Sequence, residues 1–245
     1  MRTLAWFSCG AASAVATKLT PEAEPVYCET GAEHPDNERF LADCEQWFGR
    51  KVTRLKSDKY ADTWDVWTKR RYLSGVQGAL CTIELKVAPR LAFQRPDDIH
   101  VLGYTADAPD VNRAKRLRDN YPEQRVVTPL IDRGLMKEHC LDMIGRAGIA
   151  PPPMYALGFR NNNCVPCVKA QSPGYWALMR REFPVEFDRM ARLSRELGVT
   201  LCQIGGEGGG RERIFIDEIP LDQPVSDPIQ PSCDFLCHLA EQDLR

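Results

Sequence analysis

Ten cysteines are spread along this chain of 245 residues, and two of them form a C-x-x-C pair. The pair is Cys164 and Cys167, within the stretch NNNCVPCVKAQSPGYW at 161–176. Two thiolates at this spacing supply half of a zinc site, half of an iron–sulfur site, or a redox dithiol. Disulfide frameworks are usual in small secreted domains, whereas this chain is large and its apolar N-terminus is too short for a signal peptide. Metal binding or thiol chemistry is therefore the better interpretation.

A second close pair, Cys233 and Cys237, stands near the C-terminus in PSCDFLCH. Together with the C-x-x-C pair it would make a closed four-cysteine zinc site. Alternatively, the two thiols act as a nucleophile and a resolving thiol, at rates that depend on thiolate fraction and access. Cys28, Cys44 and Cys202 lie in apolar or helical patterns, where we expect them to pack as small hydrophobic residues.

A turn of small residues, SCGAAS at 8–13, follows the first apolar stretch of the chain. Ser8 and Ser13 offer hydroxyls and Gly10 can adopt unusual dihedral angles, which is what a phosphate or sulfate cradle needs. Small residues are also how an ordinary strand-to-helix turn packs, so the turn by itself leaves both interpretations open. The glycines of GGEGGGRER at 205–213 do not follow the dinucleotide-binding pattern, and we predict a flexible loop there.

The elements that position these residues follow from hydrophobic periodicity. We predict strands at 2–8, 25–29, 51–56, 98–104 and 124–131, with helical patterns at 12–19, 35–49 and 111–121. Strands that alternate with helices favour a parallel sheet covered on both faces. The fold prediction is an α/β protein, three-layer α/β/α with a mostly parallel five-stranded sheet. Ligands of such sheets bind at the carboxyl ends of the strands, where the turn at 8–13 lies.

The alternation of predicted strands and helices ends after Leu135. A helix at 135–148 precedes a proline-rich turn and the C-x-x-C loop, and a helical stretch at 175–198 is broken around Pro184. The remainder is extended and rich in proline and aspartate. We therefore predict two units, an α/β domain at 1–174 that includes the C-x-x-C loop and a helical extension with a cysteine-containing tail at 175–245.

Composition limits the possible partners. The chain is 43% hydrophobic and 27% charged with a formal net charge of −2, so no bulk charge attracts it to nucleic acid or to a membrane surface. No apolar run reaches the ~18–20 residues that span a bilayer. We expect a cytoplasmic protein, and the sequence leaves its oligomeric state open.

Three stretches resemble the phosphoadenosine phosphosulfate (PAPS) reductases, a branch of the adenine nucleotide alpha-hydrolase-like fold. WFSCGAASAV at 6–15 is similar to their modified PP-loop; the ATP pyrophosphatases of this fold carry S-G-G-x-D-S, whereas here Cys9 and Ala12 take the second and the acidic positions. YCETGAEHPDN at 27–37 and VLGYTADAPDVNRAKR at 101–116 are similar to two further segments, with Tyr104 in place of the first arginine of G-x-R…R. The resemblance implies an adenine-nucleotide site that contains Ser8, Gly10, Ser13, Glu29, Thr30, Gly31, Lys86, Gly103 and Arg113.

The cysteines carry the most specific part of the resemblance. MYALGFRNNNCVPCVK at 154–169 resembles the loop of bacterial reductases that carry a 4Fe–4S cluster, and a Lys-Glu-x-Cys helix before an Asn-rich C-x-x-C resembles the phage and prophage type of the family. Those reductases have an upstream Cys-Cys pair, whereas CTIELKVAPR at 81–90 keeps the first cysteine and Lys86 but has Thr82 at the second position. The resemblance thus implies a 4Fe–4S cluster, with zinc as the alternative, whose ligands are Cys81, Cys140, Cys164 and Cys167. Cys140 is the substitute for the missing thiol that is nearest in chain order.

The implied function is sulfonucleotide reduction. Cys233 would attack the sulfate sulfur and leave a thiosulfonate, which a second thiol, such as Cys237, resolves to release sulfite. Lys86 and Arg113 would neutralise the anionic oxygens, and the electron donor would be a thiol protein of the thioredoxin type. Two alternatives remain. One is an ATP-dependent adenylating sulfurtransferase acting on nucleic acid, and the other is a non-catalytic nucleotide-binding or redox-binding protein with a structural four-cysteine metal site.

Overall fold

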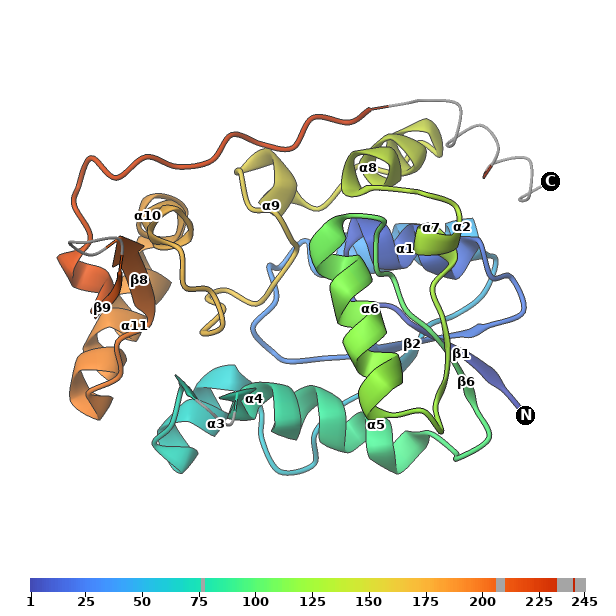
Figure 1. The fold of residues 1–245 in the computed structure, drawn as a ribbon, viewed down its shortest axis with the longest axis horizontal. Helices are drawn as coiled ribbons and strands as arrows, with labels where there is room; N and C mark the ends of the chain where they lie inside the picture. The colour runs from blue at the N-terminus through green and yellow to red at the C-terminus, as the bar shows by residue number, and fades with distance from the viewer. Residues whose placement is uncertain (76–77, 206–209, 233–239, 241–245) are drawn as a thin grey trace.

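The computed structural model describes residues 1–75, 78–205, 210–232 and 240, and Figure 1 shows their arrangement. A five-stranded sheet forms the centre of the N-terminal part. Its strands are β1 (Thr3–Trp6), β2 (Glu24–Cys28), β3 (Thr53–Leu55), β6 (Ile99–Val101) and β7 (Arg125–Val127). Their order is β3-β2-β1-β6-β7, and every neighbouring pair is parallel. The predicted parallel α/β sheet is confirmed, and all five predicted segments contribute a strand.

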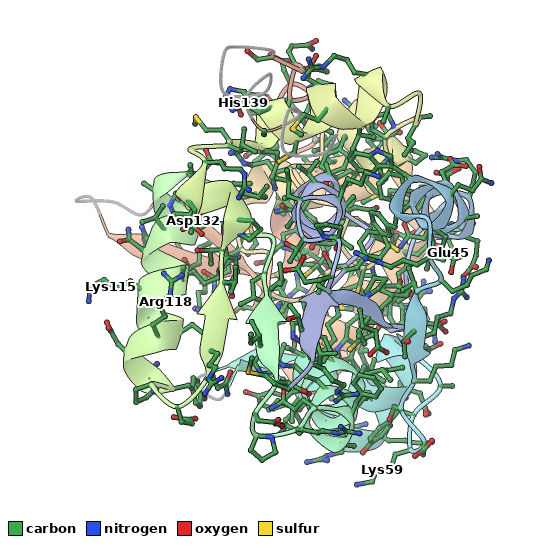
Figure 2. All side chains as sticks on the ribbon, turned by 90° about the vertical axis from the view of Figure 1, so that its right-hand side faces the viewer. Glu45, Lys59, Lys115, Arg118, Asp132 and His139 are labelled. Carbon is green, nitrogen blue, oxygen red and sulfur yellow. The ribbon has the colours of Figure 1, made fainter. Side chains whose placement is uncertain are left out.

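Helices cover both faces of this sheet. One face carries α1 (Ala11–Lys18), α2 (Asn37–Phe48), α7 (Pro129–Asp132) and α8 (Lys137–Arg146), with α1 packed against the other three. The other face carries a continuous helical run made of α4 (Leu80–Thr82), the π-helical turn η1 (Ile83–Val87) and α5 (Ala88–Phe93), together with α6 (Ala108–Asn120). Right-handed crossovers require this division, because the chain leaves β1 toward β2 and later moves the opposite way to β6 and β7. Lys115 and Arg118 on α6 lie at the margin of the molecule in Figure 2.

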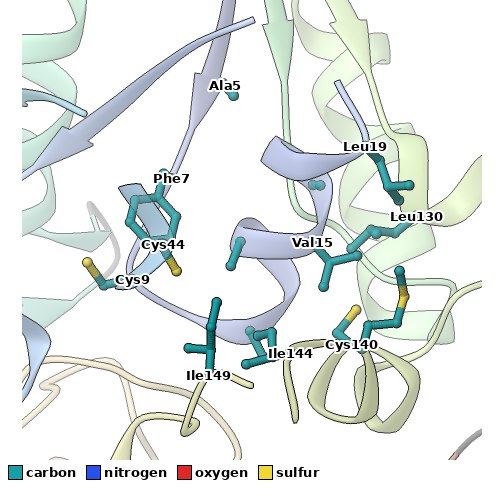
Figure 3. Packing of buried hydrophobic residues seen from close by; sticks show 14 of the residues in the cluster. Ala5, Phe7, Cys9, Val15, Leu19, Cys44, Leu130, Cys140, Ile144 and Ile149 are labelled. Atoms are coloured by element: carbon teal, nitrogen blue, oxygen red, sulfur yellow. The ribbon is translucent and has the colours of Figure 1, made fainter. Parts of the chain in front are cut away.

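Alternation along β1 separates the two faces. Ala5 and Phe7 are buried in a first hydrophobic core with α1, α2 and α8. Trp6 points the other way, where the guanidinium of Arg90 on α5 stacks 4.8 Å from the centre of its ring. Figure 3 shows part of the first core around Val15 on α1.

A second hydrophobic core lies beside the sheet and is built mainly from helices. Its elements are α3 (Thr63–Arg70), the hairpin of β4 (Ser74–Gly75) and β5 (Gly78–Ala79), α9 (Pro153–Ala156), α10 (Pro173–Glu182), α11 (Pro184–Leu197), the hairpin of β8 (Cys202–Gly205) and β9 (Arg211–Ile214), and the 3₁₀ turn η3 (Ile216–Glu218). Trp67 and Met154 contribute from before residue 174, and Trp176 and Met190 from after it. This core therefore takes residues from both sides of the predicted unit boundary.

The predicted flexible loop at 205–213 is partly wrong, because Arg211–Ile214 form strand β9 and pair antiparallel with β8. The side chains of Arg211, Glu212 and Arg213 are exposed, so the strand has no alternation of apolar and polar residues to reveal it.

The C-terminal region is extended, as the sequence predicted. Residues 220–232 have no helix or strand and run over α9 to α8 in Figure 1. Val225 packs against the second core and Ile229 against the first. The backbone N–H of Ser232 donates to the carbonyl of Glu138 at 3.3 Å, so this segment joins the first turn of α8. None of the described helices is long and apolar enough to cross a membrane.

Candidate functional site

The carboxyl ends of the strands gather the predicted nucleotide-binding residues at one edge. Ser8 follows β1, Thr30 follows β2 and Gly103 follows β6. The chain departs from β1 toward β2 on one side, and β6 pairs with β1 on the other. In open parallel sheets this change of direction opens a crevice where ligands bind. The region beyond the carboxyl ends of β1 and β6 is therefore the candidate nucleotide site.

The first turn is held by its own side chains. Ser13 Oγ accepts from the backbone N–H of Ser8 at 3.0 Å and of Gly10 at 3.3 Å, and it donates to the carbonyl of Gly10 at 2.9 Å. Cys9 adopts a left-handed conformation with φ 54°. The backbone N–H of Ala11 donates to the hydroxyl of Tyr155 at 3.0 Å. The Ser13 hydroxyl, which the sequence indicated as a ligand group, thus serves first to shape the turn.

Gly103 lets the end of β6 pass directly over the start of α1. A Cβ at Gly103 would lie 2.6 Å from Ser13 Cα and 2.7 Å from Ser13 N, which are backbone atoms. A Cβ at Gly10 would lie 3.2 Å from the Tyr155 hydroxyl. Gly31 has φ +68°, and a Cβ there would lie 2.7 Å from the carbonyl oxygen of Ala61. At Gly103 and Gly31 a side chain would therefore clash with backbone atoms, whereas at Gly10 the close neighbour is the Tyr155 hydroxyl.

The residues after β2 connect this edge with the C-x-x-C loop. Thr30 donates to Glu33 Oε1 from its backbone N–H at 2.7 Å and from its hydroxyl at 2.6 Å. The same hydroxyl lies 3.1 Å from Cys164 Sγ. Glu29 instead pairs with Arg54 at 3.2 Å and Lys56 at 2.6 Å. Thr30 thus connects the strand edge with the cysteine loop.

Tyr104 and Arg113, from the segment after β6, stay together at the rim. The guanidinium of Arg113 lies 5.6 Å from the centre of the Tyr104 ring and pairs with Asp110 at 3.0 Å. Burial raises the pKa of the Tyr104 phenol, and the positive charge of Arg113 opposes that shift. Arg113 is exposed and retains room to approach an anion.

Three cysteines line one pocket, which we call the thiol pocket. Its walls are formed by Cys81, Cys164 and Cys167 together with Thr30, Thr63, Trp67, Thr82, Lys86, Asn163, Pro166, Val168 and Lys169. The backbone N–H of Val165 donates to the carbonyl of Ala32 at 2.7 Å, and that of Cys167 donates to the Tyr175 hydroxyl at 2.7 Å. The Val165–Pro166 peptide bond between the two cysteines is cis. The two hydrogen bonds hold the C-x-x-C loop against the segment after β2 and against α10.

In the thiol pocket, burial and the positive charge of Lys86 act on the pKa of Cys164 in opposite directions. Burial raises the pKa values of the Cys164 and Cys81 thiols, and the charge of Lys86 opposes the shift at Cys164. Desolvation lowers the pKa of the Lys86 ammonium, but the Cys164 thiolate, Glu33 and the Cys167 thiolate raise it by more, so the pKa lies above its ordinary value. Lys86 therefore stays protonated beside the thiols.

Cys140 lies elsewhere. It is fully buried on α8 in the first core, and Figure 3 shows it beside Leu130 and Ile144. It does not line the thiol pocket, so its assignment as the fourth ligand has no support from the geometry and stays only a prediction. Chain order suggested Cys140, but this residue packs in the first core, where α8 contacts α1. Cys233 and Cys237 lie outside the described residues.

The donor set of the thiol pocket is one thiolate short of an iron–sulfur site. It has three cysteine sulfurs beside a protonated lysine, whereas four thiolates hold a 4Fe–4S cluster. Across the described ranges, no three or more His, Cys, Asp or Glu side chains meet at a spacing for one metal ion. A cluster distributes its thiolates over several irons, so its ligands need not converge on a single point.

Several residues of this region escaped sequence reasoning. Asn162 donates from Nδ2 to the carbonyl of Cys9 at 2.6 Å and to Asn37 Oδ1 at 2.7 Å, which fastens the cysteine loop to the first turn. The run of three asparagines before Cys164 was the available signal. The sequence carried no such signal for Glu33, Tyr155 and Trp67, because tertiary packing alone brings each of them to the site.

Comparisons with known proteins agree with the fold. No protein-family model matches this chain, and no curated protein matches it. Among solved structures, the crystal structure of phosphoadenylyl-sulfate (PAPS) reductase from Candida auris in a phosphate complex matches with a TM-score of 0.51 and 11% sequence identity. The match covers 67% of this chain and 81% of that one. The fold is therefore PAPS reductase-like.

Proposed function

We propose that this protein binds an adenine sulfonucleotide beyond the carboxyl ends of β1 and β6 and reduces its sulfuryl group by thiol chemistry. The observation that carries the proposal is the contact of 3.1 Å between the Thr30 hydroxyl and Cys164 Sγ. It makes the strand edge, where nucleotides bind in parallel sheets, continuous with a pocket of three thiols and a lysine. The likeness of fold to a PAPS reductase supports the same reading.

The residues of the strand edge have distinct roles in this proposal. The backbone N–H groups of Ala12 and Ser13 lie at the N-terminus of α1. The helix dipole would favour an anionic group there. Gly103 keeps the crevice narrow, and Thr30 and Gly31 border it from the β2 side. Lys86 and Arg113 supply positive charge as the sulfuryl oxygens gain negative charge. Glu29 holds Arg54 and Lys56 beside the entrance.

The chemistry needs two thiols and an external reductant. The Cys233 thiolate would attack the sulfuryl sulfur; an S–S bond forms and the S–O bond to the nucleotide phosphate breaks, so the nucleotide leaves with the electron pair. A second thiol, for which Cys237 is the proposed residue, then attacks Cys233 Sγ, releases sulfite with its electron pair and forms a disulfide. A dithiol protein of the thioredoxin type reduces that disulfide.

Cys81, Cys164 and Cys167 would hold a 4Fe–4S cluster in the thiol pocket, with zinc as the alternative metal. When bound, the cluster supplies fixed charge and a redox couple next to the reacting sulfuryl group. Lys86 lies between the two regions, because it lines the thiol pocket and the backbone carbonyl of Lys86 accepts from Cys28 Sγ at 3.7 Å at the end of β2. The positive charge of Lys86 would attract anionic groups in both regions.

The direct test is an anaerobic preparation assayed for nucleotide binding and sulfite release. We expect tighter calorimetric binding of PAPS or adenosine phosphosulfate than of ATP, and sulfite release when a dithiol is added. Gly10→Val should abolish binding, because its side chain meets the Tyr155 hydroxyl and displaces the turn. Cys233→Ser should bind normally and release no sulfite.

Two results would contradict the proposal. Absence of sulfonucleotide binding to the wild-type protein would remove the nucleotide site. Cleavage of ATP to AMP with sulfur transfer to a nucleic acid would favour the adenylating sulfurtransferase instead.

A further inference from the structure

A second hollow, which we call the outer hollow, borders the cysteine loop at Val165 and has a volume of about 270 Å³. It shares no lining residue with the thiol pocket, because Val165 lines the outer hollow whereas its neighbour Cys164 lines the thiol pocket. Its volume is at the lower end of the range for small-molecule sites, so it suits a ligand with the size of one ring system.

Three aromatic side chains line the outer hollow, namely His34, Trp64 and Phe183. The rings of His34 and Phe183 meet nearly edge-on with their centres 6.0 Å apart. At the rim, Val185 is 73% exposed. Aromatic faces beside an accessible apolar side chain favour a flat ring as the ligand, since such rings stack on them.

Glu186 and Arg189 supply charged groups to the outer hollow, and both belong to α11. In the part of the chain that the structure describes, the carboxylate of Glu186 has no ion-pair or hydrogen-bond partner, and the guanidinium of Arg189 has only the Trp64 ring, 4.0 Å away. The two opposite charges balance each other. A neutral ligand that offers both donors and acceptors therefore fits better than a free anion or cation.

The other two polar side chains of the outer hollow are already engaged. Glu33 accepts from the backbone N–H of Thr30 at 2.7 Å and from its hydroxyl at 2.6 Å. His34 Nδ1 accepts from the backbone N–H of Asp36 at 3.1 Å, so its other ring nitrogen carries the proton in the neutral form. A carboxylate, a guanidinium and one ring N–H thus remain for a ligand.

We propose that the outer hollow binds a guanine base, presented by a free nucleotide or by a single strand. Guanine has two acceptors, O6 and N7, on one edge and two donors, N1–H and the N2 amino group, on the adjacent edge. The fork of Arg189 donates to the first edge, and the two oxygens of Glu186 accept from the second. The ring stacks beside His34 and Phe183. This inference goes beyond the proposed function and does not rest on it.

The experiment is a calorimetric titration of the full-length protein with GMP and with IMP. IMP lacks only the N2 amino group, so it should bind about tenfold more weakly than GMP. Arg189→Gln should weaken GMP binding by about tenfold or more, and Glu186→Gln should remove the preference for GMP over IMP. Arg192→Gln and Asp188→Asn are the matched controls, because both side chains are exposed on α11 and neither lines the outer hollow. Both controls should keep the wild-type affinity.

Absence of GMP binding, or equal affinities for GMP and IMP, would overturn the inference. Wild-type GMP affinity in both Arg189→Gln and Glu186→Gln would also overturn it. Displacement of GMP by excess adenosine phosphosulfate would place GMP beyond the carboxyl ends of β1 and β6 instead, with the same consequence. A short single-stranded oligonucleotide with one guanine identifies the source of the base. Tighter binding than that of GMP would assign the site to single-stranded nucleic acid, and binding no tighter would assign it to a free nucleotide.

Discussion

Gly103 packs against the backbone of Ser13 at the carboxyl edge of the sheet. Gly103→Ala tests this close packing. The added Cβ would lie 2.6 Å from Ser13 Cα and 3.0 Å from the carbonyl carbon of Ala12. These are backbone atoms, so β6 and α1 must move apart. We expect a loss of about 1–3 kcal/mol in the free energy of unfolding, measured in urea, together with weaker sulfonucleotide binding.

Gly145→Ala is the matched control for this substitution. Gly145 lies within α8, and a Cβ there meets nothing within 4 Å. Alanine should therefore stabilise the protein by about 0.5–1 kcal/mol through better helix propensity. Equal effects of the two substitutions would show that the close approach at Gly103 is not tight in solution.

The thiol of Cys164 should titrate above the ordinary range in metal-free protein. Burial is the main cause of its raised pKa, and the Lys86 charge and the Thr30 hydroxyl lower it in part. Only the thiolate reacts with iodoacetamide, so the alkylation rate of Cys164 should rise with pH later than that of an ordinary cysteine, whose pKa is about 8.5. Lys86→Met should move the rate profile further upward, because it removes a positive charge that favours the thiolate.

Lys169→Met serves as the comparison for the alkylation profile. Lys169 also lines the thiol pocket, but its charge is among the causes of the pKa shift of Cys81 and not among those of Cys164. The profile of Cys164, followed by mass spectrometry, should stay where it is. A shift as large as that of Lys86→Met would contradict a specific role for Lys86.

Residue types at the site were better predicted than their roles. The turn at 8–13 was correctly placed after a strand, yet Ser13 holds the turn together, because short side chains bond first to the backbone nearest to them. Cys81, Cys164 and Cys167 line one pocket, whereas Cys140 does not. Which cysteine on a helix faces a given loop depends on how the helix packs, and chain order carries no such information.

At the scale of elements, α3 determines where Trp67 and Thr63 stand. Asp62→Ala removes the cap that accepts from the Asp65 N–H and should cost about 1 kcal/mol of stability. Asp62→Asn should retain most of that energy, because asparagine caps equally well. Thermal unfolding of the two variants gives the comparison, and equal losses would mean that charge, not the capping bond, is what Asp62 contributes.

The central sheet was predictable and the second core was not. Five apolar segments with turn signals gave five strands, since buried parallel strands are short, continuous apolar runs. The pairs β4–β5 and β8–β9 are short or exposed, so their side chains carry no alternating pattern. The helix at 175–198 was correctly expected to break near Pro184, where α10 ends and α11 begins.

At the scale of the whole molecule, the shared second core predicts that residues 1–174 do not form a stable unit alone. Such a fragment would leave Trp67, Met154 and Phe159 without Trp176 and Met190 of the same core. We expect aggregation or loss of the near-ultraviolet circular dichroism of the tryptophans, because large apolar surface stays exposed. Iron and sulfide should also be lost from the fragment, since Tyr175 no longer holds the Cys167 backbone.

A chain of residues 1–232 is the control for that truncation, because it retains every member of the second core. It should remain soluble with native-like circular dichroism. A well-folded 1–174 fragment would support the unit boundary predicted from the sequence.

The pairing of β1 with β6 joins Thr3 to Ile99, across nearly a hundred residues of chain. During synthesis β1 can pair with β2 early, but its other edge has no partner until β6 has left the ribosome. At about 5–20 residues per second, this takes roughly 5–20 s. Through that interval the strand destined for the centre of the sheet presents an open row of backbone donors and acceptors, which is the feature that seeds association between nascent chains. We therefore expect the yield of this protein in a cell to depend on translation speed and on what covers that edge, as well as on the stability of the finished sheet.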